Sequence, residues 1–231
     1  MTPEIENCQT GRAGAVRLLQ PGDTWRAVFL RAKILIPVLA AELSYVITNR
    51  ISSDRPDARV LSFSFDPDLP IIPAFVYIYL SYHLFIYLSL CRYLLLPAKM
   101  PEMRRLVVAM FSSMMVGSLI FLIMPTHVPR PTITGDSVTH KILLFLYGID
   151  EPFNCFPSLH VAWTFVLCFY QQKLISRQWL LTLGNWLFFI LISLSTVLIR
   201  QHYTPDIIGG LILGIAAVIL AESQWIHRRQ T

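Results

Sequence analysis

The sequence predicts an all-α membrane protein, built as a bundle of six transmembrane helices. Of its 231 residues, 55% are hydrophobic and only 14% are charged, and the mean hydropathy is +0.56. A soluble domain could not bury so much apolar surface. A hydrocarbon layer about 30 Å thick requires roughly 20 apolar residues per helical span. Six stretches approach this length, at residues 27–48, 69–96, 106–124, 156–170, 179–199 and 207–221.

The distribution of Lys and Arg supports these six spans and orients them. Cytoplasmic loops of membrane proteins carry an excess of Lys and Arg. With the N-terminus inside, thirteen of the 19 Lys and Arg residues fall on the inner side and six on the outer side. We therefore expect an integral protein of the inner or plasma membrane with both termini in the cytoplasm. The net charge of +5 then reflects topology, and no nucleic-acid partner is expected. The six outer residues are Arg50, Arg55, Arg59, Arg130, Lys141 and Arg200.

The chain outside the spans is short, so a single membrane domain is expected. Residues 1–25 are predicted to be a cytoplasmic segment, and residues 26–231 a six-span domain that carries any catalysis. Residues 1–25 have no apolar core before a cleavage site, so we expect no cleavable signal peptide. Residues 142–147, between the third and fourth spans, are apolar but too short to cross. They predict an extra helix in the membrane interface, with a packed loop helix as an equal alternative.

Other features of the spans indicate packing rather than chemistry. Glycines in the sixth span, Gly209, Gly210 and Gly214, are typical of close helix contacts. Glu42 and His83 fall within predicted spans, where we expect them to be satisfied inside the bundle, with contact to a lipid headgroup as the alternative. The four cysteines show no metal-binding spacing and predict no disulfide. They are Cys8, Cys91, Cys155 and Cys168.

The first polar cluster, residues 156–160, lies where the fourth span begins on the outer side. Pro157 suits the first position of a helix, so backbone N–H groups near Ser158 are expected to point outward. Such a helix start binds anions. His160, one turn into this helix, is positioned to donate a proton to a group bound there.

The second cluster, residues 200–206, lies in the short outer turn before the sixth span. Thr204 is a candidate N-cap, and the turn is expected to bring His202 against Asp206. A carboxylate that accepts from one ring nitrogen leaves the other nitrogen free as a base or nucleophile. Arg130 and Arg200 supply the forked donors that phosphate oxygens favour. The pattern therefore predicts attack on a phosphorus atom at the outer face.

These residues resemble the three signature motifs of the type 2 phosphatidic acid phosphatase superfamily, a family of membrane enzymes. The motifs are a Lys…Arg-Pro segment, a Pro-Ser-x-His segment and a Ser-Arg…His…Asp segment. Their order and spacing agree over roughly the last 110 residues, and together they are specific although each is weak alone. The matched residues are Arg130 and Pro131, then Pro157, Ser158 and His160, then His202 and Asp206.

By this resemblance His202 is the nucleophile that forms a phosphohistidine, Asp206 orients it, and His160 is the general acid for the leaving group. Arg130 and Ser158 would hold the phosphoryl group, with Arg200 as a further phosphate ligand. The implied substrate is a phosphorylated lipid in the membrane. Neither a metal ion nor another cofactor is implied.

The sequence departs from the first and third motifs at one cation each. Ile123 stands where the first motif has Lys, and Thr196 where the third has Arg. Arg200, four residues after Thr196, would share its helical face and restore the charge. His127 could do the same for the first motif. These losses also resemble the branch that contains inositol phosphorylceramide and sphingomyelin synthases.

Several alternatives stay open at this point. The enzyme could be a lipid phosphatase that uses water, or a phosphotransferase that moves a phosphoryl headgroup to a lipid or polyol hydroxyl. An inactive lipid-binding scaffold would keep the same bundle, and a transporter would need polar groups through the midplane. A single histidine is more often structural, and Arg130 or Arg200 could merely anchor a helix end at headgroups. The identity of the lipid, the acceptor and the oligomeric state do not follow from the sequence.

Overall fold

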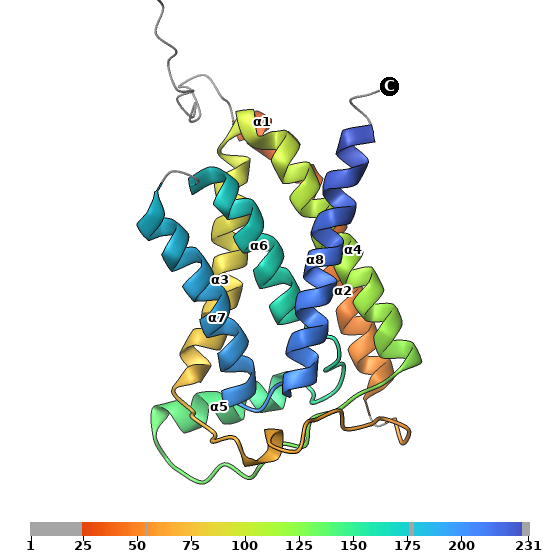
Figure 1. Ribbon diagram of the computed structural model, residues 1–231, viewed down its shortest axis with the longest axis vertical. Coiled ribbons are helices and arrows are strands. Elements are labelled where there is room, and N and C mark those ends of the chain that lie inside the picture. Colours follow the sequence, from red (N-terminus) through yellow and green to blue (C-terminus); the bar gives the residue numbers. More distant parts are fainter. Residues whose placement is uncertain (1–24, 54, 176–177, 228–231) are drawn as a thin grey trace, which may run out of the picture.

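The structure is a computed structural model that describes residues 25–53, 55–175 and 178–227, and these residues form a helical bundle without strands (Figure 1). The described residues exclude all of the predicted segment 1–25 except Trp25. They also exclude five of the cations assigned to the inner side, which are Arg12, Arg17, Arg177, Arg228 and Arg229. The α-helices are α1 (Trp25–Ala32), α2 (Ile36–Ser52), α3 (Phe75–Leu94), α4 (Met100–Ile123), α5 (Val138–Ile149), α6 (Leu159–Ile175), α7 (Trp179–Leu198) and α8 (Thr204–His227). Short 3-10 helices η1 (Lys33–Leu35), η2 (Asp66–Asp68) and η3 (Pro97–Lys99) connect some of them.

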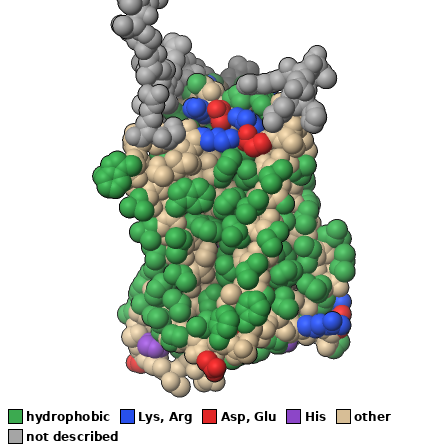
Figure 2. All heavy atoms as spheres, viewed as in Figure 1, with side chains coloured by type: hydrophobic (Ala, Val, Ile, Leu, Met, Phe, Trp, Pro, Cys, Tyr) green, Lys and Arg blue, Asp and Glu red, His purple; other side chains and the backbone are tan. Residues whose placement is uncertain are grey.

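Four of the described helices are long and apolar enough to cross a membrane. They are Phe75–Leu94, Pro97–Ile123, Trp179–Leu198 and Thr204–Trp225. Hydrophobic side chains cover the middle of the molecule and charged side chains gather at its two ends (Figure 2). The prediction of an all-α integral membrane protein is thereby confirmed. Helices α2 and α6, 17 residues each, correspond to the other two predicted spans.

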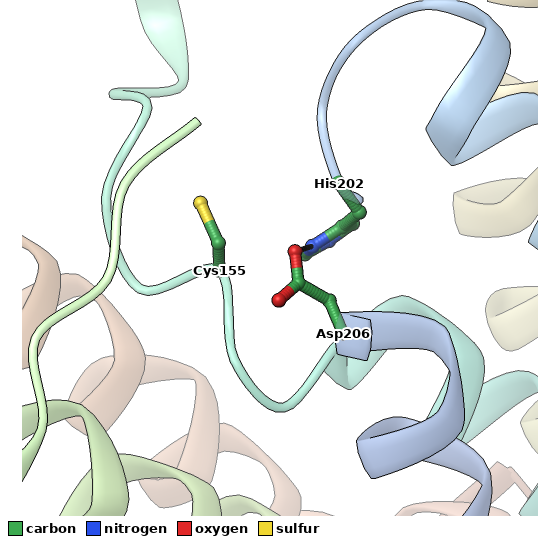
Figure 3. Close-up of side chains that lie close together, drawn as sticks. All are labelled: Cys155, His202 and Asp206. Carbon is green, nitrogen blue, oxygen red and sulfur yellow. Dashed lines mark hydrogen bonds and ion pairs between the residues drawn. The ribbon is translucent and has the colours of Figure 1, made fainter. Parts of the chain in front are cut away.

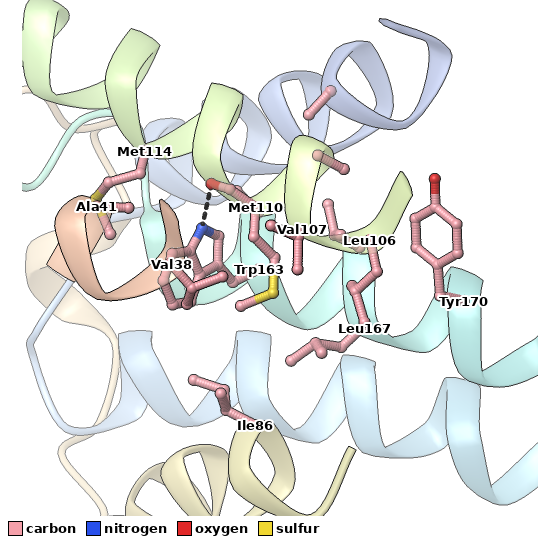
Figure 4. Packing of buried hydrophobic residues seen from close by; sticks show 14 of the residues in the cluster. Val38, Ala41, Ile86, Leu106, Val107, Met110, Met114, Trp163, Leu167 and Tyr170 are labelled. Carbon is pink, nitrogen blue, oxygen red and sulfur yellow. Dashed lines mark hydrogen bonds between the residues drawn. The ribbon is translucent and has the colours of Figure 1, made fainter. Parts of the chain in front are cut away.

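The helices pack around α4 and α6. Helix α4 contacts α2 and α8, while α6 contacts α7 and α8. Trp163 on α6 is fully buried in this core, and its indole N–H donates to the carbonyl of Met110 on α4 at 3.2 Å (Figure 4). A buried indole needs such a partner. Loops and α5 lie at the end of the bundle opposite α1 and the C-terminal end of α8 (Figure 1).

Close packing of α6 on α8 depends on the predicted glycines. A Cβ at Gly210 would lie 2.3 Å from the carbonyl oxygen of Ser158, and one at Gly214 would lie 2.9 Å from that of Ala162. Since both neighbours are backbone atoms, they cannot move aside without moving α6. The helix-packing prediction for these glycines is confirmed.

The prediction that the two polar residues within the spans are enclosed by the bundle was wrong, and contact with a lipid headgroup stays a prediction. Glu42 on α2 and His83 on α3 are both exposed on the bundle surface, not enclosed by it. Neighbouring positions on α2, Leu39 and Leu43, are 67% and 59% exposed. This side of α2 therefore faces away from the bundle. Because α2 is apolar on all sides, the sequence periodicity could not show which side faces the bundle.

Replacement of Gly210 by Ala is expected to lower the stability of the bundle. The added methyl group would overlap the Ser158 carbonyl, and overpacking of this kind costs about 1–3 kcal/mol. Thermal unfolding in detergent measures the effect. Gly184→Ala on α7 is the matched control, because nothing lies within 4 Å of its added Cβ. Equal melting temperatures for the two variants would contradict the packing argument.

Candidate active site

The turn between α7 and α8 places the second predicted cluster. After α7 ends at Leu198, the N–H of Arg200 donates to the carbonyl of Val197 at 2.9 Å and that of Gln201 to the carbonyl of Thr196 at 2.8 Å. This pair of bonds is a Schellman motif, which requires a left-handed residue. Arg200 occupies that position with φ 54°. The N–H of His202 also reaches the Thr196 carbonyl, at 3.1 Å, so the motif fixes the backbone of His202.

The guanidinium of Arg200 binds backbone carbonyls and not the site. It donates to the carbonyl oxygens of Asp66, Pro67 and Leu69, and the residue is only 5% exposed. The expectation that Arg200 shares a helical face with Thr196 was wrong, because the helix ends before it and the left-handed turn redirects its side chain. These bonds give Arg200 a structural role, and its predicted role as a phosphate ligand is untested.

Asp66, which sequence reasoning missed, holds the start of α8. One of its carboxylate oxygens accepts from both the N–H and the hydroxyl of Thr204, and the other accepts from the N–H of Phe63 at 2.8 Å. Asp66 is fully buried. Thr204 was expected to cap α8 with its own hydroxyl, but its hydroxyl donates to Asp66 instead. A lone Asp in a loop 138 residues earlier gives no signal of this contact.

His202 and Asp206 meet as predicted. His202 Nδ1 lies 3.3 Å from Asp206 Oδ2, and that oxygen also accepts from the N–H of Tyr203 at 3.0 Å. The second bond is half of a capping box, with Asp206 as the third residue of α8. Both side chains are buried, at 6% and 1% exposure. The carboxylate therefore holds a proton on Nδ1 and leaves the lone pair on Nε2.

The start of α6 is bonded directly to the start of α8. Ser158 N–H donates to the backbone carbonyl of Asp206 at 3.0 Å, and Ser158 Oγ accepts from the N–H of Val161 at 3.4 Å. Ser158 is thus the N-cap of α6. The sequence predicted Pro157 at the first position of the helix. Instead Pro157 precedes the N-cap, and α6 begins at Leu159. The N–H of Ser158 is consequently bound to protein and not free for an anion.

These contacts bring the two histidines together. His202 Nε2 lies 3.4 Å from His160 Nδ1, and the ring centroids are 5.6 Å apart. The cavity beside them has a volume of about 10 Å³, room for about one water molecule. A larger cavity of about 360 Å³ lies at the other end of the bundle, between residues of η1, α4 and α8, and none of the predicted site residues lines it.

A second carboxylate, which the sequence analysis did not include, lies on the far side of His160. His160 Nε2 is 2.7 Å from the hydroxyl of Tyr79 on α3, and that hydroxyl donates to Asp150 Oδ2 at 3.3 Å. Tyr45 on α2 donates to Asp150 Oδ1 at 3.4 Å. In the sequence, Tyr79 is one of many aromatic residues in a predicted span, and nothing distinguishes it from a packing residue.

Arg130, predicted from the first motif, is bonded to the residue that precedes His202. It donates to the carbonyl of Tyr147 at 2.7 Å and to Gln201 Oε1 at 2.8 Å, while its Nε is buried with no partner among the described residues. Gln201 directly precedes His202 in the sequence, so Arg130 is linked to the histidine pair through this neighbouring residue. Ile123 is 73% exposed and supplies no charge. His127 is half-buried with its ring against Phe153, and its role as a substitute cation stays a prediction.

Cys155, His202 and Asp206 form a group whose ligand atoms lie within 4.8 Å of one another (Figure 3). Three such atoms could hold a metal ion. However, burial, Asp206 and Asp150 raise the pKa of the Cys155 thiol well above its usual value. The thiol also donates to the carbonyl of Pro152 at 3.3 Å. A metal ion would have to displace the thiol proton and the bond to Pro152 before Cys155 could bind it.

The fold and this site define an integral membrane protein with paired histidines at one end of a helical bundle. The chain belongs to the PAP2 superfamily, whose sequence profile matches residues 59–220, more than half of its length. Membership supports a phosphatase-type function related to lipids. No curated protein matches the chain. The narrower resemblance to inositol phosphorylceramide synthases stays a prediction.

Replacement of Arg200 by Lys is expected to destabilise the protein. One ammonium group cannot satisfy the carbonyls that the guanidinium binds, and the loss of buried bonds costs about 1–3 kcal/mol. The melting temperature in detergent is the measurement. Arg59→Lys is the control, because Arg59 is exposed at the same end of the bundle and its side chain makes no hydrogen bond within the described residues. A melting temperature equal to that of the control would restore Arg200 as a candidate ligand.

Proposed function

We propose that the protein is a lipid phosphatase, which hydrolyses a phosphate monoester or diphosphate of a lipid at the outer membrane face through a phosphohistidine. The observation that supports this most directly is the contact of His202 Nε2 with His160 Nδ1, with Asp206 behind His202. A nucleophile, an orienting carboxylate and a proton donor are then in one place. Membership of the PAP2 superfamily supports the same chemistry.

In the first step, the lone pair on His202 Nε2 attacks phosphorus and forms a P–N bond. The bond from phosphorus to the leaving oxygen breaks, and its electron pair stays on that oxygen. His160 Nδ1 gives its proton to the same oxygen, so the lipid leaves as a neutral alcohol, or as a protonated phosphate if the substrate is a diphosphate. Asp206 stabilises the positive charge that develops on His202.

In the second step, water attacks the phosphohistidine. His160 Nδ1 accepts a proton from the water as the new P–O bond forms. The P–N bond breaks, and its electron pair returns to His202 Nε2. Inorganic phosphate leaves, and His160 is protonated for the next cycle. The overall reaction consumes one ester and one water and yields one alcohol and one phosphate.

Arg130 is the proposed ligand for the phosphate oxygens. Its planar guanidinium can bind two oxygens at once, and its Nε is not used by the described residues. Ser158 would act beside it, because its hydroxyl accepts a bond from Val161 and retains a proton to donate. We leave Arg200 out of this set, since its donors are occupied by carbonyls.

The substrate must part the two histidines. A gap of 3.4 Å between nitrogens has no room for a phosphoryl group, and the adjoining cavity is no larger than one water molecule. The contact between the rings is the one that a bound phosphoryl group would replace. Binding therefore separates the rings while Asp206 keeps its hold on His202.

We further propose that α2, α3, α4, α6, α7 and α8 are six spans, with both termini in the cytoplasm and the histidines at the opposite face. Helix α5 would lie in the membrane interface. In its favour, α5 buries Leu143 and Leu146 against the bundle while Val138 and Phe145 are each 68% exposed. It also crosses the end of the bundle that carries the histidines (Figure 1). Lipid headgroups would then meet the site directly.

His202→Ala is expected to lower kcat by at least about 10³-fold, because no nucleophile remains. Purified protein would be given phosphatidate or a prenyl diphosphate with a ³²P-labelled terminal phosphate and then quenched. We expect an acid-labile, base-stable label on the wild-type protein and none on the variant. His140→Ala is the control, since His140 lies on α5 and its side chain bonds, within the described part of the chain, only to Ser137. A label that persists in His202→Ala would contradict the assignment.

The same assay identifies the acceptor. Release of free phosphate is the result expected of a phosphatase. Headgroup transfer to an added lipid or polyol hydroxyl without phosphate release would contradict the hydrolytic proposal and favour a phosphotransferase.

Treatment with EDTA is expected to leave the activity unchanged, because the proposed steps use only imidazole, carboxylate and guanidinium groups. The rate of phosphate release before and after dialysis against chelator is the measurement. A loss that zinc restores would instead assign a metal to Cys155, His202 and Asp206. Cys155→Ser would then change the metal content, which the present proposal does not expect.

A further inference from the structure

We propose that Tyr79 and Asp150 form a positioning arm for His160, which holds its proton and fixes which ring nitrogen faces the substrate. This rests on the proposed function, in which His160 is the general acid. Neither residue belongs to the motifs that relate the chain to its family. Together with Asp206 and His202, the arm gives a continuous line of polar contacts between two carboxylates.

The distances define the direction of each bond. An ionised carboxylate can only accept, so the Tyr79 hydroxyl gives its proton to Asp150 Oδ2, 3.3 Å away. The Tyr79 oxygen is then left as an acceptor toward His160 Nε2 at 2.7 Å. His160 must therefore carry a proton on Nε2. In the general-acid step the ring must carry a second proton on Nδ1, and the Tyr79–Asp150 pair lies at the opposite nitrogen from that proton.

Packing holds His160 in this orientation. The rings of Tyr79 and Tyr82 on α3 lie 4.7 and 4.9 Å from the His160 ring, centroid to centroid. Tyr79 is 1% exposed, so its hydroxyl has little access to water as an alternative partner. The ring of His160 is thus fixed on the side away from His202.

The arm matters most when the substrate is bound. The contact between the two histidines is lost when a phosphoryl group enters between them. After that, each ring is held only at its far nitrogen, His202 by Asp206 and His160 by Tyr79. Without Tyr79, His160 would be free to turn its proton away from the leaving oxygen.

Asp150 is buried near the site among four polar groups. It follows α5 and is faced by Tyr45 from α2, Tyr79 from α3, Arg130 from the preceding loop and His202 from the α7–α8 turn. Burial raises the pKa of its carboxyl, and these four neighbours oppose that rise without cancelling it. Because the folded state binds the proton more tightly than the unfolded state, this group stabilises the fold at low pH, and that stability is lost as the pH rises through its folded pKa. A buried carboxyl that two tyrosine hydroxyls bond beside the histidines fits a role in the reaction.

Tyr79→Phe tests the arm directly, because it removes only the hydroxyl. A general acid contributes about 10²–10⁴-fold, and loss of its positioning should remove part of this. We expect kcat on an alkyl phosphate ester to fall roughly 10- to 100-fold, with KM changed less than twofold. On a nitrophenyl phosphate ester, whose leaving group needs no proton, the loss should shrink to less than about threefold. Tyr82→Phe is the matched control, since its ring packs on the same histidine and its hydroxyl makes no hydrogen bond within the described residues.

Asp150→Asn tests the other end of the arm. We expect the same dependence on the leaving group, together with a melting temperature at neutral pH equal to or above that of the wild type. The difference should close as the pH falls through the Asp150 pKa, because the wild type then also carries a neutral group. Asp136→Asn, an exposed acid paired with Lys141 on the surface, is the control. An equal loss of kcat on both esters, or a lowered melting temperature, would assign Asp150 and Tyr79 a structural role and overturn the proposal.

A spectroscopic measurement separates failure of the arm from failure of the proposed function. In protein with ¹⁵N-labelled histidine, the Nε2 of His160 should show a bonded proton in the wild type and a changed shift in Tyr79→Phe. His160→Gln assigns the signal. If the wild type hydrolyses no phosphate ester but the Nε2 signal responds to Tyr79→Phe, the proposed function fails and the arm stands. If esters are hydrolysed and neither the signal nor the leaving-group dependence changes, the arm fails alone.

Discussion

The contact between the first turns of α6 and α8 is the constraint on which the site depends. It consists of one backbone bond, from Ser158 N–H to the Asp206 carbonyl, and of a glycine, Gly210, that leaves no side chain between the two backbones. His160 lies two residues after Ser158, and Asp206 holds His202. A single close approach of two helices therefore sets the separation of two imidazoles that are 42 residues apart in the sequence. Any increase in the distance between α6 and α8 would separate the histidines by a similar amount.

The turn before α8 is held by a residue in an unfavourable conformation. A side chain at φ 54° is uncommon outside glycine, yet Arg200 occupies the left-handed position of the Schellman motif. Glycine would satisfy the backbone but could not reach the carbonyls of η2 and the residue after it. The guanidinium bonds offset the backbone strain and, with Asp66, tie the 63–69 loop to the start of α8. The third motif of the family is thus supported by a loop outside all three motifs.

The sequence was sufficient for the parts of the structure that depend on local patterns. Apolar length gave the helices, and the i, i+4 spacing gave the contact of His202 with Asp206. It failed where a side chain bonds across the chain. Arg200 was assigned to phosphate because its type and motif position suit that role, whereas a left-handed turn points it at backbone carbonyls. Tyr79, Asp150 and Asp66 were missed for the same reason, since each finds its partner 71 to 138 residues away. Glu42 and His83 show the converse, because a span that is apolar on every side does not reveal which side faces the bundle.

The hydrogen bonds within the site limit which ligands can open it. In surroundings of low polarity, unsatisfied polar groups are expensive. Here each candidate group has a hydrogen-bond partner: His202 has Asp206, His160 has Tyr79 and Arg130 has Gln201. Within the described residues only single atoms, such as Arg130 Nε, are left unbonded. The remaining cavity is only about 10 Å³. A ligand that enters must break the contact between the histidines and compete for Arg130, and only a ligand that brings several strong acceptors can replace what it disrupts. A neutral lipid headgroup offers no such compensation, whereas a phosphate does. Under the proposed function, the closed site would therefore select against unphosphorylated lipids before any contact specific to the substrate is made.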